Sequence, residues 1–209
     1  MNLTDDLRWR YATKNMTGES ISADPLEFIL SAANLSATSY GLQPFTIVAV
    51  SNKEVKMKLQ AAAYGQAQVG SSSHVLVFAV PTKITPEDIQ AYINNIGVTR
   101  NIPAEALEGL KNMMTGTIGN LPAEQQQIWA AKQAYISLGT ALAAAANQRI
   151  DACPMEGFDA TQFDEILGLT EQGLRSVVIM PIGFRSPDDA SANYIKVRKP
   201  ESEIFKYVV

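Results

Sequence analysis

The chain has 209 residues, of which 46% are hydrophobic, and a net charge of −4. This length supports one sizeable core, so we expect a single domain over residues 1–209. The negative balance argues against nucleic acid or an anionic membrane surface as a partner. Cys153 is the only cysteine, which excludes a disulfide within the chain and fits a reducing compartment. The polar N-terminus and the interrupted apolar stretches favour a soluble cytoplasmic protein.

Prolines, capping residues and apolar runs divide the chain into helices and strands. Thr4, Asp24 and Asn52 are the expected N-caps of the first three helices. Helices are expected at 25–34, 52–64, from 85, from 103, 122–149 and 161–167, and strands at 45–50, 74–80, 150–153 and 175–184, followed by an extended tail at 203–209. Because helices and strands do not alternate regularly, the pattern favours an α+β sheet with helices around it over a doubly wound parallel sheet.

The helix expected at 122–149 contains an unusually apolar and alanine-rich part, 133–146. This part has no polar face, so it belongs in the centre of the molecule or in a tight interface. A short strand and the sequence Pro154-Met155-Glu156-Gly157 follow it. Because glycine has no Cβ, the backbone amides near Gly157 can approach a flat ligand closely.

Few side chains offer chemistry of their own. The only histidine, His74, begins a buried strand, and a structural role is favoured over that of a hydrolase base. Cys153 lies at a strand end, where a small buried filler is favoured over a reactive thiolate. One histidine and one cysteine cannot form the usual zinc sets. The sequence contains neither a GxGxxG motif nor a P-loop, so the two common nucleotide-binding motifs are missing.

Two short basic groups stand near the two ends of the chain. They comprise Arg8, Arg10 and Lys14, and Lys196, Arg198 and Lys199. Arginines can fork a phosphate and lysines can add a point charge, which would suit an anion site. Solvated surface charge is the commoner role of such groups, and the residue pattern by itself leaves both interpretations open.

Four segments in order carry a resemblance to a known family. They are Arg10-Tyr11-Ala12-Thr13-Lys14, Thr38-Ser39-Tyr40-Gly41-Leu42-Gln43-Pro44, Pro154-Met155-Glu156-Gly157-Phe158-Asp159 after Lys132-Gln133, and Lys196-Val197-Arg198. With this order and spacing the chain resembles the nitroreductase family of FMN-dependent NAD(P)H oxidoreductases, from about Leu7 to Arg198. The resemblance implies a central, mostly antiparallel sheet surrounded by helices, with a long central helix. It also implies a homodimer whose subunits exchange a C-terminal strand.

The resemblance assigns roles to particular residues. Arg10, Lys196 and Arg198 would hold the FMN phosphate, and Lys14 would face the pyrimidine side of the ring. Glu156 would act through its backbone N–H, which donates to flavin N5, so that no side chain is itself catalytic. Thr38, Ser39 and Gly41 would come from the opposite subunit. The full set of expected FMN contacts is Arg10, Tyr11, Ala12, Lys14, Thr38, Ser39, Gly41, Gln68, Gln133, Pro154, Met155, Glu156, Gly157, Lys196 and Arg198.

The chain departs from the family pattern at several of these positions. Tyr11 and Ala12 replace a frequent His-Ser pair, which removes a hydroxyl from the phosphate site. Gly41 stands where some members carry Asn. Around Gln68 an Asn and a basic residue that are often present are both missing, so Gln68 could approach the ring by hydrogen bonding only. The departures put in doubt how strongly the flavin is bound and what redox potential the bound flavin has.

The implied activity passes two electrons from NADH or NADPH to a nitroaromatic, a quinone or a similar small acceptor by a ping-pong cycle. The chemistry would then belong to the flavin, which agrees with the shortage of catalytic side chains. Residues 86–122 form the expected acceptor-pocket region, with Met113 and Met114 as either ligand contacts or ordinary packing and a mobile lid at 115–120. Two alternatives stay open: another reductive reaction on the same fold, such as enone or nitroalkene reduction or dehalogenation, and a non-catalytic flavin-binding dimer.

Overall fold

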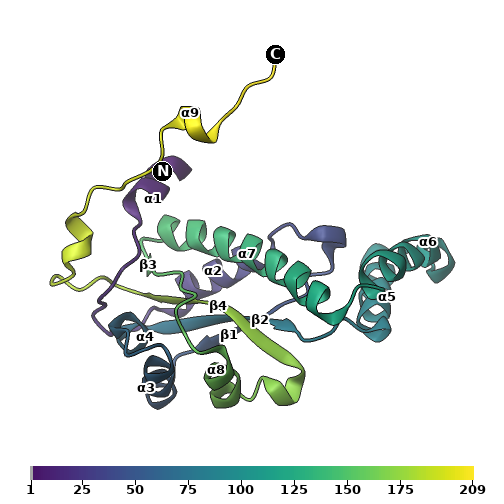
Figure 1. Ribbon diagram of the computed structural model, residues 1–209, viewed down its shortest axis with the longest axis horizontal. Coiled ribbons are helices and arrows are strands. Elements are labelled where there is room, and N and C mark those ends of the chain that lie inside the picture. The colour runs from purple at the N-terminus through teal and green to yellow at the C-terminus, as the bar shows by residue number, and fades with distance from the viewer. Residues whose placement is uncertain (1) are drawn as a thin grey trace.

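A computed structural model describes residues 2–209 and forms one four-stranded antiparallel sheet with helices on both faces (Figure 1). The strands are β1 (Thr46–Val50), β2 (His74–Pro81), β3 (Asp151–Ala152) and β4 (Leu174–Gly183), in the order β1-β2-β4-β3. The helices are α1 (Leu3–Trp9), α2 (Ala23–Asn34), α3 (Lys53–Ala62), α4 (Ala67–Ser71), α5 (Pro86–Arg100), α6 (Ala104–Met114), α7 (Ala123–Asn147), α8 (Ala160–Leu167) and α9 (Glu201–Ile204). This is the α+β architecture that the irregular order of elements predicted.

The central strand β2 pairs with β1 and β4, with Leu76 opposite Ala49 on one side and Met180 on the other. Its interior residues are fully buried on both faces, as the run of apolar residues predicted. Leu76, Phe78 and Val80 pack into the core beneath α2 and α7, whereas Val75 and Val77 pack toward α3 and α8. The sheet therefore separates two cores. The N-terminal segment reaches its β3 edge, where Ala12 pairs with Ala152.

Helices α5 and α6 project beyond the end of the sheet, at one end of the molecule in Figure 1. They pack on each other around a small cluster of their own, which includes Ile89, Met114 and Ile118. The helix expected from residue 85 is α5, and Thr85 forms a capping box with Asp88 at its start. Within residues 2–209, no helix combines the length and the apolar character that crossing a membrane requires.

The long helix α7 is buried on one face only. Ala130, Ala134 and Ala141 are fully buried against the sheet. Tyr135 and Ile136 on the other face are 38% and 47% exposed. The apolar stretch therefore does cover the core, but in the single chain it also presents an apolar face to the outside, contrary to a wholly central position.

Several predicted boundaries were wrong in detail. Asn2, not Thr4, caps α1 by accepting from the Thr4 amide. Asp24 lies inside the first turn of α2, which begins after Ser22. The predicted loop at 115–120 is a π-helical turn over Thr115–Gly119, because Ile118 is drawn into the cluster around Ile89. The tail predicted as extended from residue 203 begins instead with the short helix α9 and is exposed from there onward.

Candidate functional site

The segment from Arg10 to Thr17 is fastened along the β3 edge of the sheet. Ala12 pairs with Ala152, and Met16 pairs with Arg185. The buried Asp189 carboxylate accepts from the Lys14 amide at 2.8 Å and from the Tyr11 hydroxyl at 3.0 Å. Burial alone would raise the pKa of Asp189, but hydrogen bonds from surrounding amides lower it below its ordinary value. Asp189 thus stays ionised and fixes the backbone on which Lys14 stands.

Asp151 is a second buried anchor for the same segment. Its carboxylate accepts from Arg185 Nε at 2.9 Å and from the Thr13 hydroxyl at 3.3 Å, and it forms an ion pair with Arg185 Nη2 at 2.7 Å. The Arg185 guanidinium also lies 4.3 Å from the centre of the Trp9 ring and 4.7 Å from that of Tyr11. Burial, and then the bond to Asp189, raises the pKa of Tyr11 to about 12. Sequence reasoning missed Asp151, Arg185 and Asp189, although a carboxylate that opens a buried strand signals a buried partner.

The two basic groups from the ends of the chain meet in one hollow, here called the basic pocket. It has a volume of about 430 Å³ and is lined by Arg10, Tyr11, Ala12, Lys14, Ser191, Tyr194, Ile195, Lys196 and Arg198. The Lys196 ammonium donates to the carbonyl of Arg10, which joins segments that are 186 residues apart. Six of the expected FMN contacts therefore share one pocket.

The cations of the basic pocket lack counter-charges. Burial, and then the neighbouring Arg198, lowers the pKa of Arg10, and burial, Arg10 and Arg198 lower the pKa of Lys196. Arg10 Nε is buried without a hydrogen-bond partner. The ion pairs within residues 2–209 involve Arg8, Arg149 and Arg185 and none of the pocket's cations. Mutual repulsion and an unpartnered donor are the features of a site that binds an anion.

The Cys153 sulfur lies beside Lys14, and Gln68 contacts both this sulfur and that of Met155. Lys14 Nζ is 3.8 Å from Cys153 Sγ, and Gln68 Nε2 is 3.9 Å from the same sulfur and 3.4 Å from Met155 Sδ. Burial raises the pKa of Cys153, and Lys14 opposes this only in part. Cys153 is therefore a neutral, buried thiol, as the filler interpretation held. Gln68 connects the basic pocket to the Pro154–Gly157 segment.

The Pro154–Gly157 segment passes from the core to the surface. Met155 is buried and exchanges two backbone hydrogen bonds with Ile179, whereas Glu156 and Gly157 are exposed. Within residues 2–209, the amides of Glu156 and Gly157 donate to no acceptor. Beside this turn, a second pocket of about 440 Å³ opens between α7 and the start of β4. The turn therefore presents two backbone amides that are free within residues 2–209, and it lies beside this second pocket.

Thr38, Ser39, Gly41 and Gln133 do not line the basic pocket, and the Thr38–Gly41 loop contacts α5 through Tyr92. The Ser39 amide donates to Gln133 Oε1 at 2.8 Å, and Gln133 is buried. The backbone of this loop is unusual, because Tyr40 and Gly41 have φ of 57° and 75°. Gln133 therefore belongs to the loop's surroundings, not to those of Arg10, within a single chain.

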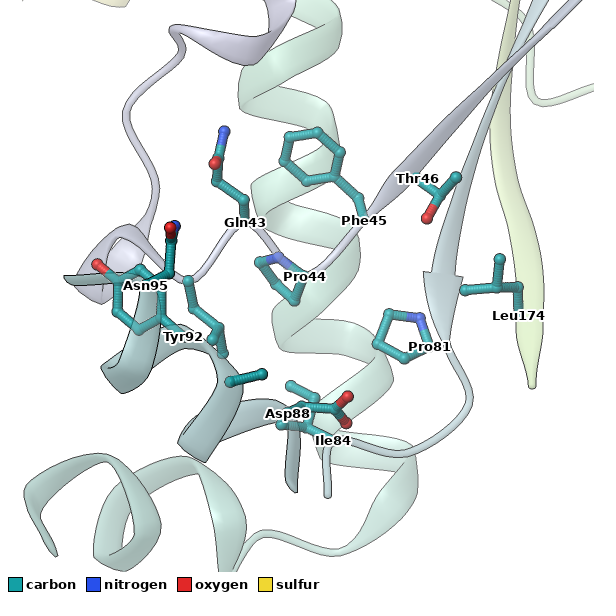
Figure 2. Close-up of a pocket in the computed structure, with 12 residues that line it drawn as sticks. Gln43, Pro44, Phe45, Thr46, Pro81, Ile84, Asp88, Tyr92, Asn95 and Leu174 are labelled. Carbon is teal, nitrogen blue, oxygen red and sulfur yellow. The ribbon is translucent and has the colours of Figure 1, made fainter. Parts of the chain in front are cut away.

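A third hollow, of about 470 Å³, lies between this loop, α5 and the edge strand β1 (Figure 2). Figure 2 shows Tyr92 and Asn95 of α5 facing Gln43 and Pro44. The Tyr92 hydroxyl donates to the carbonyl of Tyr40 at 2.6 Å, so the predicted acceptor-pocket region holds the loop in place. Elsewhere in that region Met114 is fully buried, which makes it ordinary packing, and Met113 is 56% exposed.

Comparisons with known proteins agree with this geometry. The model of the Nitroreductase family matches residues 7–184. YfkO of Bacillus subtilis, provisionally named an NAD(P)H nitroreductase, is 30% identical over 99% of this chain and 97% of its own. The structure of YdfN from Bacillus subtilis, provisionally named a nitroreductase, covers 98% of both chains with a TM-score of 0.87 and 25% identity. A protein of Exiguobacterium sibiricum with a similar provisional name, solved in complex with FMN, shares the fold with a TM-score of 0.84 and 22% identity, over 100% of this chain and 98% of its own. The chain therefore belongs to the Nitroreductase family.

Proposed function

We propose that this protein is an FMN-dependent oxidoreductase that passes two electrons from NAD(P)H to a small nitroaromatic, quinone or related acceptor. The observation that carries the proposal is the basic pocket, where Arg10, Lys196 and Arg198 converge around the buried, unpartnered Arg10 Nε. A phosphate group would supply the missing counter-charge and accept from the guanidinium fork. The Exiguobacterium sibiricum relative binds FMN, and YfkO carries the NAD(P)H nitroreductase name.

The rest of the neighbourhood suits a flat ring joined to that phosphate. Lys14 supplies a positive charge beside the pocket, and the free amides of Glu156 and Gly157 are donors for polar atoms at a ring edge. When bound, FMN supplies the two-electron chemistry. The chain binds and orients it. The Cys153 thiol is not set up as a proton shuttle, because burial raises its pKa.

The lone histidine does not suggest a competing hydrolase. His74 Nδ1 lies 2.8 Å from Ser73 Oγ at the start of β2. Burial, and then Lys56, lowers the pKa of His74, which keeps the ring neutral. The Ser73 hydroxyl is already engaged by the amide of Ile21 at 2.7 Å. This serine and histidine therefore form a structural tie between chain segments.

The active unit that we propose is a homodimer. The Thr38–Gly41 loop lies away from the basic pocket of its own chain, and a second copy could bring it there. The exposed face of α7 with Tyr135 and Ile136 is apolar, as an interface requires. The tail also carries exposed apolar residues, including Phe205 and Tyr207, and β1 is an edge strand able to accept a further strand.

Purified protein tests the proposal directly. Protein stripped of flavin and mixed with FMN is expected to quench the cofactor's fluorescence, and anaerobic NADH or NADPH is expected to bleach the bound flavin. A nitroaromatic or a quinone should then restore the colour, and parallel lines in double-reciprocal plots would mark a ping-pong cycle. Absence of FMN binding would contradict the proposal. Binding without reduction by either nicotinamide would instead identify a non-catalytic flavin-binding dimer.

A further inference from the structure

The exposed turn at Glu156–Gly157 accepts hydrogen bonds from two side chains that belong to distant elements. Tyr135 of α7 donates its hydroxyl to Glu156 Oε1 at 2.5 Å. Gln66, which precedes α4, donates its amide to the Gly157 carbonyl at 2.7 Å. Nothing in the activity proposed above uses either contact.

Gln66 is itself held in one orientation. Its Oε1 accepts from Gln68 Nε2 at 3.3 Å, and its Nε2 also donates to the Ala63 carbonyl at 3.1 Å. Gln68 is 3% exposed and reaches Cys153 and Met155 with the same nitrogen. The side-chain amides of Gln66 and Gln68 thus connect the turn, by successive hydrogen bonds, to the sulfur atoms of Cys153 and Met155. The orientation of Gln66 is therefore fixed from within the core.

The backbone of the turn has one hydrogen bond of its own, from the Phe158 amide to the Glu156 carbonyl at 2.9 Å, and its other backbone bonds lie on its flanks. Met155 is paired with Ile179, and the amide of Asp159 donates to the Ala62 carbonyl at 2.9 Å. Between these points the amides of Glu156 and Gly157 are free within residues 2–209. An exposed peptide with free donors can rotate unless side chains restrain it. Tyr135 and Gln66 restrain it at two different groups, the Glu156 carboxylate and the Gly157 carbonyl.

We propose that Tyr135 and Gln66 are positioning residues that hold the Glu156–Gly157 turn so that its free amides are preorganised for the ring of the cofactor. This inference rests on the proposed function. Tyr135 suits the role, because burial and then the bond to Glu156 raise its pKa, so that the hydroxyl remains a donor throughout the neutral range. Gln66 restrains the peptide through the Gly157 carbonyl, and Tyr135 restrains it through the Glu156 carboxylate.

The test uses FMN with the full-length protein and the variant Tyr135→Phe. Loss of the hydrogen bond is expected to raise the FMN dissociation constant about three- to tenfold and to shift the midpoint potential of the bound flavin. Tyr64→Phe is the matched control, since Tyr64 is 73% exposed and its hydroxyl bonds to nothing within residues 2–209. The control should leave both quantities unchanged. Thermal unfolding of the flavin-free proteins separates a folding defect from a change at the site.

A double-mutant cycle decides whether Tyr135 acts through Glu156. Glu156→Ala keeps the backbone amide but removes the acceptor, so adding Tyr135→Phe to it should change the midpoint potential no further. Glu156→Gln keeps an acceptor oxygen and should retain most of the wild-type potential. Additive effects in the cycle, or a Tyr135→Phe protein equal to wild type in affinity and potential, would overturn the inference while leaving the proposed function intact. A wild-type protein that binds no FMN would overturn both.

Discussion

The β3 edge of the sheet and the Thr38–Gly41 loop are fixed by different kinds of interaction. At the β3 edge, the buried carboxylates of Asp151 and Asp189 anchor the segment that carries Arg10 and Lys14. On the α5 side, neutral contacts fix the Thr38–Gly41 loop, through the amide of Gln133 and the hydroxyl of Tyr92. Among residues 2–209, the cations of the basic pocket in the first region have no counter-charge, whereas the second region fixes a loop in an unusual backbone shape. The difference is what the proposed function requires, in which the first region would bind the phosphate and the second would supply a preformed surface.

The largest effect is expected from removing a carboxylate at the β3 edge. Asp151→Asn would leave Arg185, which is 29% exposed in its side chain, without its counter-charge, and should lower the free energy of unfolding by about 3 kcal/mol. Asp88→Asn is the matched change in the α5 region and should cost about 1 kcal/mol, because it weakens only an exposed capping box. Urea unfolding of the two flavin-free variants measures both. Equal losses would remove the contrast between the regions.

Arg198→Ala tests the unpaired charges of the basic pocket. It should weaken FMN binding by about 1.5–3 kcal/mol, since it removes a charged hydrogen-bond donor to phosphate. Arg8→Ala is the control, because Arg8 is exposed and already pairs with Asp5 at 2.9 Å. Titration of FMN fluorescence gives both dissociation constants. An unchanged constant in the Arg198 variant would remove this residue from the site.

Gly41→Ala tests the preformed loop. An alanine Cβ would lie 2.4 Å from the Tyr92 hydroxyl, and the φ of 75° disfavours any side chain. The variant should therefore lose about 1–2 kcal/mol of unfolding free energy. Tyr92→Phe relieves the steric conflict but not the backbone strain, and it also removes the hydrogen bond to the Tyr40 carbonyl, so Tyr92→Phe alone is the reference for the double variant. In that background Gly41→Ala should still cost part of the loss, and no cost would show that the positive φ is tolerated here.

Much of the fold follows from local patterns in the sequence. The buried strand β2, the capping box at Thr85, the Asn52 cap and the left-handed Gly168 after α8 each depend on residues within a few positions of one another. Helix α4 was missed, because five residues give too short a period to detect.

The site was predictable in part. The residue pattern identified the two basic groups as one possible anion site, the family resemblance assigned them to the FMN phosphate, and the structure brings them together in one pocket. Tyr11 and Asp189 are 178 positions apart, and Thr13 and Asp151 are 138 apart. No local pattern relates such residues, so the anchors beneath the pocket had to come from the three-dimensional arrangement.

The smallest effect is a pH dependence that arises from Lys196. As the pH rises, the loss of its charge should act in opposite directions on the stability of the flavin-free protein and on FMN affinity. Burial and the charges of Arg10 and Arg198 lower the pKa of Lys196, so the folded chain releases this proton at a lower pH than the unfolded chain. Without FMN, the unfolding free energy therefore gains a contribution as the pH rises through the lowered pKa toward about 10.4, the ordinary lysine value. A bound phosphate favours the charged form, so FMN affinity should fall over the same range, by about three- to tenfold.

Lys196→Arg provides the control for this pH dependence, because an arginine stays charged throughout the alkaline range. FMN titrations at a series of pH values should then show a decline in the wild type and a flatter profile in the variant. A parallel decline in both proteins would assign the titration to another group, such as the flavin itself. If affinity instead rose with pH in the wild type, relief of repulsion would outweigh the attraction to phosphate, and the charges of the basic pocket would not serve to bind that anion.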